Sequence, residues 1–194
     1  MKWTLANILT SSRIFLSPVF FLLFRAIDLG QLKGFVPLAA LLVLFLVLEM
    51  TDLFDGLVAR KMKQTSDFGK IFDPLADSIC RLTYFISFTL AGMMAGWILL
   101  ILVYRDVLVA YVRLVLMQNK VVMGAKWSGK IKAWVYAAGG IYGILYFYLK
   151  NSLHEPIQWD ILNPLKDIVF IGCAVMALIT VVDYLSSIRG VKKK

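Results

Sequence analysis

The chain has 194 residues, of which 60% are hydrophobic, and its formal net charge at pH 7 is +9. Several apolar runs are long enough to cross a bilayer, which excludes an ordinary soluble domain and predicts an integral membrane protein with one domain, residues 1–194. The basic residues lie between the apolar runs, so the charge is interpreted as membrane topology and not as a nucleic-acid surface. Cys80 and Cys173 both lie in apolar segments, and we expect packing roles for them rather than a disulfide.

Six apolar segments are predicted to span the membrane, which makes the expected fold class all-α. Helices are expected because a lipid-exposed backbone must satisfy its own hydrogen bonds, and because the segments are too long for barrel strands. The predicted spans are 14–27, 35–58, 71–94, 97–117, 131–149 and 167–187. Residues 2–10 mix tryptophan, lysine and apolar side chains, which predicts a short N-terminal helix lying at the membrane interface.

The connectors richest in lysine and arginine predict the orientation of the chain. They are 60–70, 120–132 and the tail 189–194, and all three fall on one side of the membrane if six spans alternate. Since basic loops remain on the cytosolic side, both termini are predicted to be cytosolic.

Four aspartates stand at the predicted cytosolic ends of the second and third spans. Asp52 and Asp55 are three residues apart, and Asp73 and Asp77 are four apart, so each pair lies on one helix face. The short connector favours neighbouring helices, which would bring the four carboxylates into one pocket. Such a pocket requires a cation, and oxygen ligands without Cys or His favour a hard ion such as Mg²⁺ or Mn²⁺. The alternative is that acids only solvate helix ends or pair with nearby lysines, and we assign that role to Asp67.

Small residues follow the aspartates. Gly56 comes directly after the first pair, and Gly69 opens the next helix. Glycine in a helix costs about 1 kcal/mol relative to alanine, and a common reason for it is the close approach of another group. Ala59 continues this small surface, and Arg60 stands at its end. The pattern predicts two metal ions beside a narrow slot, an arrangement that polarises phosphoryl groups.

The aspartate pattern resembles the complete signature of a known family. Asp52-x-x-Asp55-Gly56-x-x-Ala59-Arg60, then eight residues, then Gly69-x-x-x-Asp73-x-x-x-Asp77 is similar to the motif of the CDP-alcohol phosphatidyltransferases. Within this family the chain is most similar to the bacterial phosphatidylglycerophosphate synthases. Further similar stretches run through the chain: Asn7 to Arg13, Arg105-Asp106 with Arg113, Trp127 to Lys132, and Tyr184 to Gly190.

The resemblance implies an enzyme of phospholipid biosynthesis that transfers a phosphatidyl group from CDP-diacylglycerol to an acceptor hydroxyl and releases CMP. It implies a six-helix fold, usually a homodimer, in a bacterial inner membrane with the active site facing the cytosol. The implied ligands of two Mg²⁺ or Mn²⁺ ions are the four carboxylates: Asp52, Asp55, Asp73 and Asp77. Asp77 is also the implied general base. The implied CDP-lipid site comprises small and basic residues of the signature: Gly56, Ala59, Arg60 and Gly69.

The acceptor that the resemblance implies is glycerol 3-phosphate, whose phosphate requires a second cationic pocket. The predicted residues of this pocket are basic side chains outside the signature: Arg81, Arg105, Arg113, Lys130 and Lys132. The alternative is that each of these side chains only extends to the membrane interface or pairs with Asp106. Two departures from the synthase pattern, Ser78 in place of a lysine and Ala133 in place of a threonine, leave other acceptors open. Inositol phosphate, inositol or serine would use the same chemistry, as would choline or ethanolamine phosphotransfer.

Two other classes of protein fit parts of the pattern. A divalent-cation carrier would place acids along a path through the membrane, but the four aspartates gather at one edge and only Glu49 continues inward. A structural scaffold would not depend on the charge of Asp77. Of the three classes, only an enzyme would use the aspartates, the glycines and the basic residues together. No nucleic-acid partner is expected.

Overall fold

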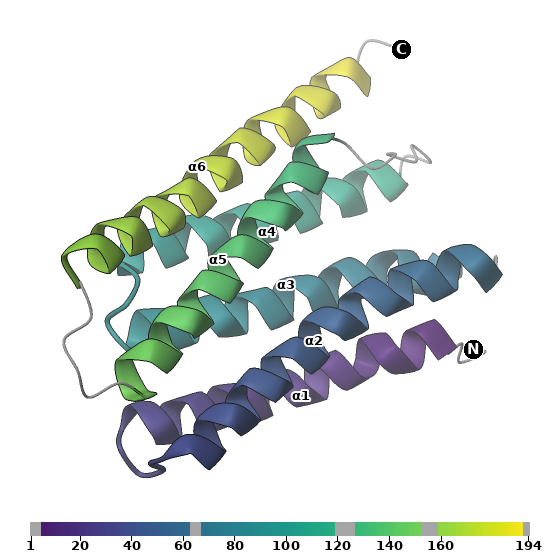
Figure 1. The fold of residues 1–194 in the computed structure, drawn as a ribbon. Coiled ribbons are helices and arrows are strands. Elements are labelled where there is room, and N and C mark those ends of the chain that lie inside the picture. The colour runs from purple at the N-terminus through teal and green to yellow at the C-terminus, as the bar shows by residue number, and fades with distance from the viewer. Residues whose placement is uncertain (1–4, 63–66, 119–126, 153–158, 192–194) are drawn as a thin grey trace. The chain divides into compact units, whose positions relative to one another are not determined.

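The computed structural model describes the backbone of residues 5–62, 67–118, 127–152 and 159–191, and the side chains of residues 10–51, 72–115, 127–152 and 161–186. Within these ranges the chain forms six α-helices and no strands (Figure 1). The helices are α1 (Leu5–Asp28), α2 (Phe35–Met62), α3 (Asp67–Leu90), α4 (Gly96–Gln118), α5 (Trp127–Ser152) and α6 (Trp159–Val191). The all-α prediction is therefore confirmed for the described part of the chain.

Each predicted span overlaps one helix, but most of the helices extend beyond the predicted bounds. α5 begins at Trp127, so the stretch before the fifth predicted span is helical, and α3 ends at Leu90 where the prediction continued to residue 94. The expected short N-terminal helix is not a separate element, because α1 runs from Leu5 to Asp28 without a break. No glycine or proline stands before Pro18 to interrupt it.

Two of the described helices are long and apolar enough to cross a membrane by length and composition. They are Thr10–Asp28 and Ile161–Ser186, and a shorter apolar helical stretch covers Phe35–Thr51. Large apolar side chains are also exposed along the helices; Phe15 is 77% and Trp134 is 76% exposed. So many large exposed apolar side chains are unusual for a protein in water. A membrane crossing by all six helices stays a prediction.

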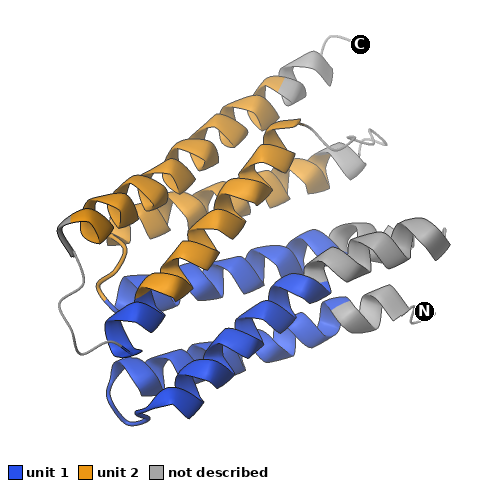
Figure 2. Ribbon diagram, in the orientation of Figure 1, with its two compact units in different colours: residues 1–91, 147–155 blue, residues 92–146, 156–194 orange. Residues whose placement is uncertain are grey.

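The chain divides into two compact units (Figure 2). Unit 1 comprises residues 1–91 and 147–155, and unit 2 comprises residues 92–146 and 156–194. Unit 1 therefore contains α1, α2, α3 and the last turns of α5, whereas unit 2 contains α4, α6 and the rest of α5. The single domain expected over residues 1–194 stays a prediction.

Aromatic side chains fill the core of unit 1. The ring of Tyr84 on α3 lies with its centroid 4.8 Å from that of Phe20 on α1 and 5.0 Å from that of Phe45 on α2. One turn further along α1, Phe24 stacks on Phe147 of α5 with 4.0 Å between ring centroids. Such pairs contribute about 0.5–1.5 kcal/mol each beyond the burial of their surface. The cluster fixes the face that α1 presents to α2 and α3, both of which it contacts.

α1 ends in a Schellman motif centred on Gly30. The amide of Gly30 donates to the carbonyl of Ile27, and the amide of Gln31 donates to the carbonyl of Ala26, each at 2.9 Å. Gly30 has a φ of 70°, a left-handed conformation that glycine adopts without strain. The motif reverses the chain so that α2 can begin at Phe35.

Unit 2 is built on the contact between α4 and α6. The buried face of α6 carries small residues, including Cys173 and Ala177, which permit close approach of helices. The start of α6 is tied to α5 by the hydroxyl of Tyr146, which donates to Asn163 Oδ1 at 2.6 Å. Cys173 and Cys80 are both free and buried, as predicted.

Candidate active site

Two of the signature aspartates, Asp73 and Asp77, have described side chains, and both contact α1. The hydroxyl of Thr10 donates to Asp73 Oδ1 at 3.0 Å. Arg13 Nη1 donates to Asp77 Oδ1 at 2.5 Å, which makes an ion pair. The donors are three residues apart on α1 and the acceptors four apart on α3, so one face of α1 holds both carboxylates.

The burial of the Arg13–Asp77 pair is asymmetric. The side chain of Arg13 is 2% exposed, whereas that of Asp77 is 36% exposed. A buried charge is stable only when it is paired, because leaving water costs several kcal/mol per ion. Asp77 therefore balances a cation inside unit 1 while a third of its own surface remains accessible to a substrate.

Six residues of the predicted metal and CDP-lipid sites lie outside the described side chains: Asp52, Asp55, Gly56, Ala59, Arg60 and Gly69. Their backbone is helical in α2 and α3, so the helical spacing on which the prediction rests is present. Their convergence with Asp73 and Asp77 stays a prediction. Among the described side chains alone, no three Asp, Glu, His or Cys residues come close enough to hold a metal ion.

The two predicted metal ligands whose side chains the structure describes, Asp73 and Asp77, fit a hard divalent ion. Asp73 and Asp77 place carboxylate oxygens on one face of α3, and such oxygens are the ligands that Mg²⁺ and Mn²⁺ prefer. The one softer group described nearby on this helix, the thiol of Cys80, is buried and lies 3.1 Å from the hydroxyl of Tyr84.

A second polar cluster lies in the interior of unit 2. Arg105 donates to Asp106 Oδ1 at 2.6 Å and to Thr180 Oγ1 at 2.9 Å, and Lys132 donates to the same oxygen of Asp106 at 3.1 Å. The exposed fractions of the Arg105, Asp106 and Lys132 side chains are only 7%, 5% and 10%. Two cations share one carboxylate, so these three side chains carry a formal charge of +1 in a buried environment.

The other three basic residues predicted for the acceptor pocket have different surroundings. Arg113 donates to the hydroxyl of Tyr184 at 2.9 Å, which joins α4 to α6. Lys130 is exposed at the start of α5, with its ammonium 4.9 Å from the ring centroid of Trp127. Arg81 is partly buried on α3 of unit 1, one turn after Asp77.

Pairing with Asp106, which was the alternative role for the basic residues, is therefore present for Arg105 and Lys132. Their contact with an acceptor phosphate stays a prediction.

Sequence reasoning missed the α1 donors to Asp73 and Asp77, and it missed one partner of Arg105. The stretch around Thr10 and Arg13 was noted as a motif, but its contacts with the aspartates were not predicted. Its spacing of three residues, matched to the spacing of four between Asp73 and Asp77, was the available signal. Thr180 was also missed, although it is the one hydroxyl in the apolar run 168–182.

Comparison with known proteins places these residues in a family. The family model for CDP-alcohol phosphatidyltransferase matches residues 3–188. A CDP-diacylglycerol–glycerol-3-phosphate 3-phosphatidyltransferase of Bacillus subtilis (strain 168) is 34% identical over 138 residues, which cover 68% of this chain and 72% of the relative. A probable phosphatidylglycerophosphate synthase of Mycobacterium tuberculosis (strain CDC 1551 / Oshkosh) is 29% identical over 182 residues, or 94% and 80% of the two chains. A cardiolipin synthase (CMP-forming) of Rattus norvegicus is 35% identical over 116 residues, but these are only 57% of this chain and 35% of the relative.

The family match agrees with the contacts in unit 1. It includes Thr10 and Arg13 on α1 together with Asp73 and Asp77 on α3, the residues that the structure brings together. It also extends across unit 2, so it is not confined to the aspartate signature. The chain is an enzyme that belongs to the CDP-alcohol phosphatidyltransferase family.

Proposed function

We propose that this enzyme transfers the phosphatidyl group of CDP-diacylglycerol to a hydroxyl of glycerol 3-phosphate and releases CMP. The observation that carries the proposal is the pair of aspartates on α3, each held by a donor from α1. The choice of acceptor is supported by the names of the relatives that share 68% and 94% of this chain. The match to the cardiolipin synthase would favour a different acceptor. It is weaker support than the other two matches, because only 35% of that protein is matched.

In the proposed reaction Asp77 accepts the proton of the attacking hydroxyl. The hydroxyl oxygen then forms a bond to the lipid-side phosphorus of CDP-diacylglycerol, the bond from that phosphorus to the bridging oxygen of CMP breaks, and CMP leaves. A general base must lie within hydrogen-bond reach of its proton, so the orientation of its carboxyl group matters. Arg13 holds one oxygen of Asp77 at 2.5 Å and thereby sets that orientation.

The metal site that we propose consists of Asp52, Asp55 and Asp73, with Asp77 as a further ligand. When bound, two Mg²⁺ or Mn²⁺ ions supply charge stabilisation for the diphosphate of the donor lipid. Thr10 fixes the carboxylate of Asp73 from outside the site by its hydrogen bond of 3.0 Å. The proposed CDP-lipid slot is formed by the neighbouring small and basic residues: Gly56, Ala59, Arg60 and Gly69.

The acceptor phosphate is assigned to the basic residues of the chain outside the signature: Arg81, Arg105, Arg113, Lys130 and Lys132. Asp106 keeps Arg105 and Lys132 together against their mutual repulsion. Arg81 supplies a positive charge near Ser78, where the synthases usually have a lysine.

We further propose that all six helices cross a bacterial inner membrane, with both termini and the aspartates on the cytosolic side, as one domain that forms a homodimer. The basic connectors 60–70 and 120–132 support this orientation. The exposed apolar side chains on the helices support contact with lipid.

The test is CMP release by the purified protein with Mg²⁺ and CDP-diacylglycerol. Glycerol 3-phosphate, inositol phosphate, inositol, serine and phosphatidylglycerol are supplied as acceptors in parallel reactions, the last because cardiolipin synthesis with CMP release requires it. Release with glycerol 3-phosphate alone is expected. Release with one of the other acceptors and none with glycerol 3-phosphate would keep the chemistry but refute the proposed acceptor.

A further inference from the structure

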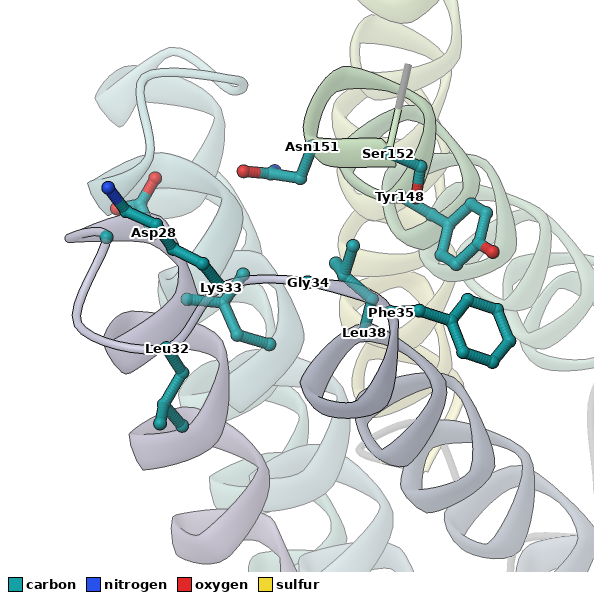
Figure 3. Close-up of a pocket in the computed structure, with 11 residues that line it drawn as sticks. Asp28, Leu32, Lys33, Gly34, Phe35, Leu38, Tyr148, Asn151 and Ser152 are labelled. Carbon is teal, nitrogen blue, oxygen red and sulfur yellow. The ribbon is translucent and has the colours of Figure 1, made fainter. Parts of the chain in front are cut away.

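Unit 1 contains a cavity of about 490 Å³ at the end of α1, where the chain turns into α2 (Figure 3). Asp28 at the end of α1, Lys33 in the turn and Phe35 at the start of α2 line it, as do Asn151 and Ser152 at the end of α5. Figure 3 shows the Lys33 side chain extending toward Asp28, with the Asn151 amide directed to the same side of the cavity. None of these residues belongs to the aspartate site.

The cavity lies at the far end of α1 from the aspartates. α1 is continuous from Thr10, which contacts Asp73, to Asp28, which lines the cavity. At a rise of 1.5 Å per residue these two levels are about 27 Å apart along the helix, close to the roughly 30 Å thickness of a bilayer's hydrocarbon core. If α1 crosses the membrane as proposed, the cavity stands at the level of the lipid headgroups in the leaflet opposite the aspartates.

The charges around the cavity favour an anion. Asp28 is paired with Arg25 on the same helix, so its carboxylate is already engaged. Lys33 forms no ion pair with any residue that the structure describes. The three side chains of Arg25, Asp28 and Lys33 therefore carry a net charge of +1. A β-carbon placed on Gly30 would lie 3.4 Å from Cε of Lys33, so the lysine stem folds back over the turn beside the cavity.

The wall and the rim add polar and apolar features. The Ser152 hydroxyl is buried without a hydrogen-bond partner among the described residues, and a buried polar group of this kind is usually satisfied by a ligand or water. Beside the polar wall, Leu32 is 41% and Phe35 is 70% exposed. A ligand with a charged head and an apolar body matches both parts.

We propose that this cavity binds the phosphodiester headgroup of a membrane phospholipid in the leaflet opposite the aspartates. Lys33 contacts the phosphate, Ser152 donates to it, and Leu32 and Phe35 pack against the first carbons of the lipid chains. Inorganic phosphate has the same charged chemistry, but it would not use the apolar rim. The proposal depends on the membrane placement of α1 and not on the acceptor of the transfer reaction.

Native mass spectrometry of the detergent-purified protein titrated with phosphatidylglycerol tests this site. Lys33→Gln is compared with wild type and with the control Lys150→Gln. Lys150 is exposed near the end of α5, next to Asn151, but it does not line the cavity. We expect Lys33→Gln to weaken lipid binding about tenfold, because a charge-assisted hydrogen bond is lost, and Lys150→Gln to bind as wild type does. Ser152→Val, which replaces the hydroxyl with a bulkier apolar group, should also weaken binding.

Wild-type affinity in the Lys33→Gln protein would overturn the proposal, as would an equal loss in both lysine variants, which would indicate non-specific attraction to the lipid. A second titration uses inorganic phosphate as the competitor. Displacement of the lipid by phosphate at concentrations similar to that of the lipid would show that the site recognises free phosphate, and the lipid assignment would be wrong. Retention of the lipid supports it.

Discussion

Arg13 on α1 and Asp77 on α3 form an ion pair with 2.5 Å between Nη1 and Oδ1, although they are 64 positions apart in the chain. The arginine is buried and the aspartate is partly accessible. This relationship gives the N-terminal motif a role in the proposed mechanism, because it fixes the carboxylate that we assign as general base.

Replacing Arg13 with lysine should lower kcat while leaving the KM for CDP-diacylglycerol nearly unchanged. Lysine keeps the positive charge but loses the planar donor geometry of arginine. We expect a fall in kcat of roughly 10- to 100-fold, because a small misplacement of a reacting group can cost about 100-fold in rate. Arg25→Lys is the matched control, since Arg25 also lies on α1 and pairs with an aspartate, Asp28, away from the site. Equal kcat values for the two variants would contradict a positioning role for Arg13.

Replacing Thr10 with valine should weaken the response to Mg²⁺. The change removes the hydrogen bond to Asp73 with little change in shape, and loss of such an outer contact to a metal ligand typically costs about 10- to 100-fold in metal affinity. The measurement is the Mg²⁺ concentration that gives half-maximal CMP release. Thr83→Val is the control, because the hydroxyl of Thr83 donates to a backbone carbonyl of α3 and not to a carboxylate. An unchanged Mg²⁺ requirement in Thr10→Val would count against this role.

Two substitutions in unit 2 should differ sharply in their effect on stability. Asp106→Asn removes the carboxylate charge that the buried Arg105 and Lys132 side chains share, and the loss of one partner of a buried pair costs about 3–5 kcal/mol. Thr180→Val removes one hydrogen bond from Arg105, which is worth about 1.5–3 kcal/mol when the donor is charged. Unfolding followed by circular dichroism in one detergent compares them. A smaller loss for Asp106→Asn than for Thr180→Val would show that the carboxylate does not hold the cluster together.

Replacing Arg113 with alanine should raise the KM for glycerol 3-phosphate much more than the KM for CDP-diacylglycerol. The prediction follows from its assignment to the acceptor phosphate. Because Arg113 also donates to Tyr184, the variant Tyr184→Phe separates the two roles by removing the hydroxyl while keeping the guanidinium. We expect Tyr184→Phe to have the smaller effect on the acceptor KM. Equal increases in both KM values for Arg113→Ala would argue against an acceptor site there.

The sequence predicted the helices well because each is marked by a long apolar run. Its errors fall at helix ends, because a helix can extend beyond the apolar run that marks it. α5 already begins at Trp127, although the next residues, Ser128 to Lys130, are polar or glycine. Polar residues do not by themselves end a helix, so hydropathy alone could not locate this boundary.

The sequence also predicted the aspartate pairs, because residues three or four apart share a helix face. It could not predict which other residues contact them. Thr10 and Asp73 are 63 positions apart, and Arg105 and Thr180 are 75 apart, so only the packing of different helices reveals these hydrogen bonds. Local spacing therefore indicated the candidate residues, whereas tertiary structure was required to show how Asp73 and Asp77 are held.

The most direct test of the mechanism compares wild type with Asp77→Asn in two assays, CMP release with glycerol 3-phosphate and binding of CDP-diacylglycerol. The amide cannot accept the proton of the hydroxyl, so we expect CMP release to fall by about 100- to 10,000-fold, the usual contribution of a general base. Binding of the CDP-lipid should largely survive, because the other three carboxylates remain. Normal CMP release by Asp77→Asn would contradict the assignment of Asp77 as the base.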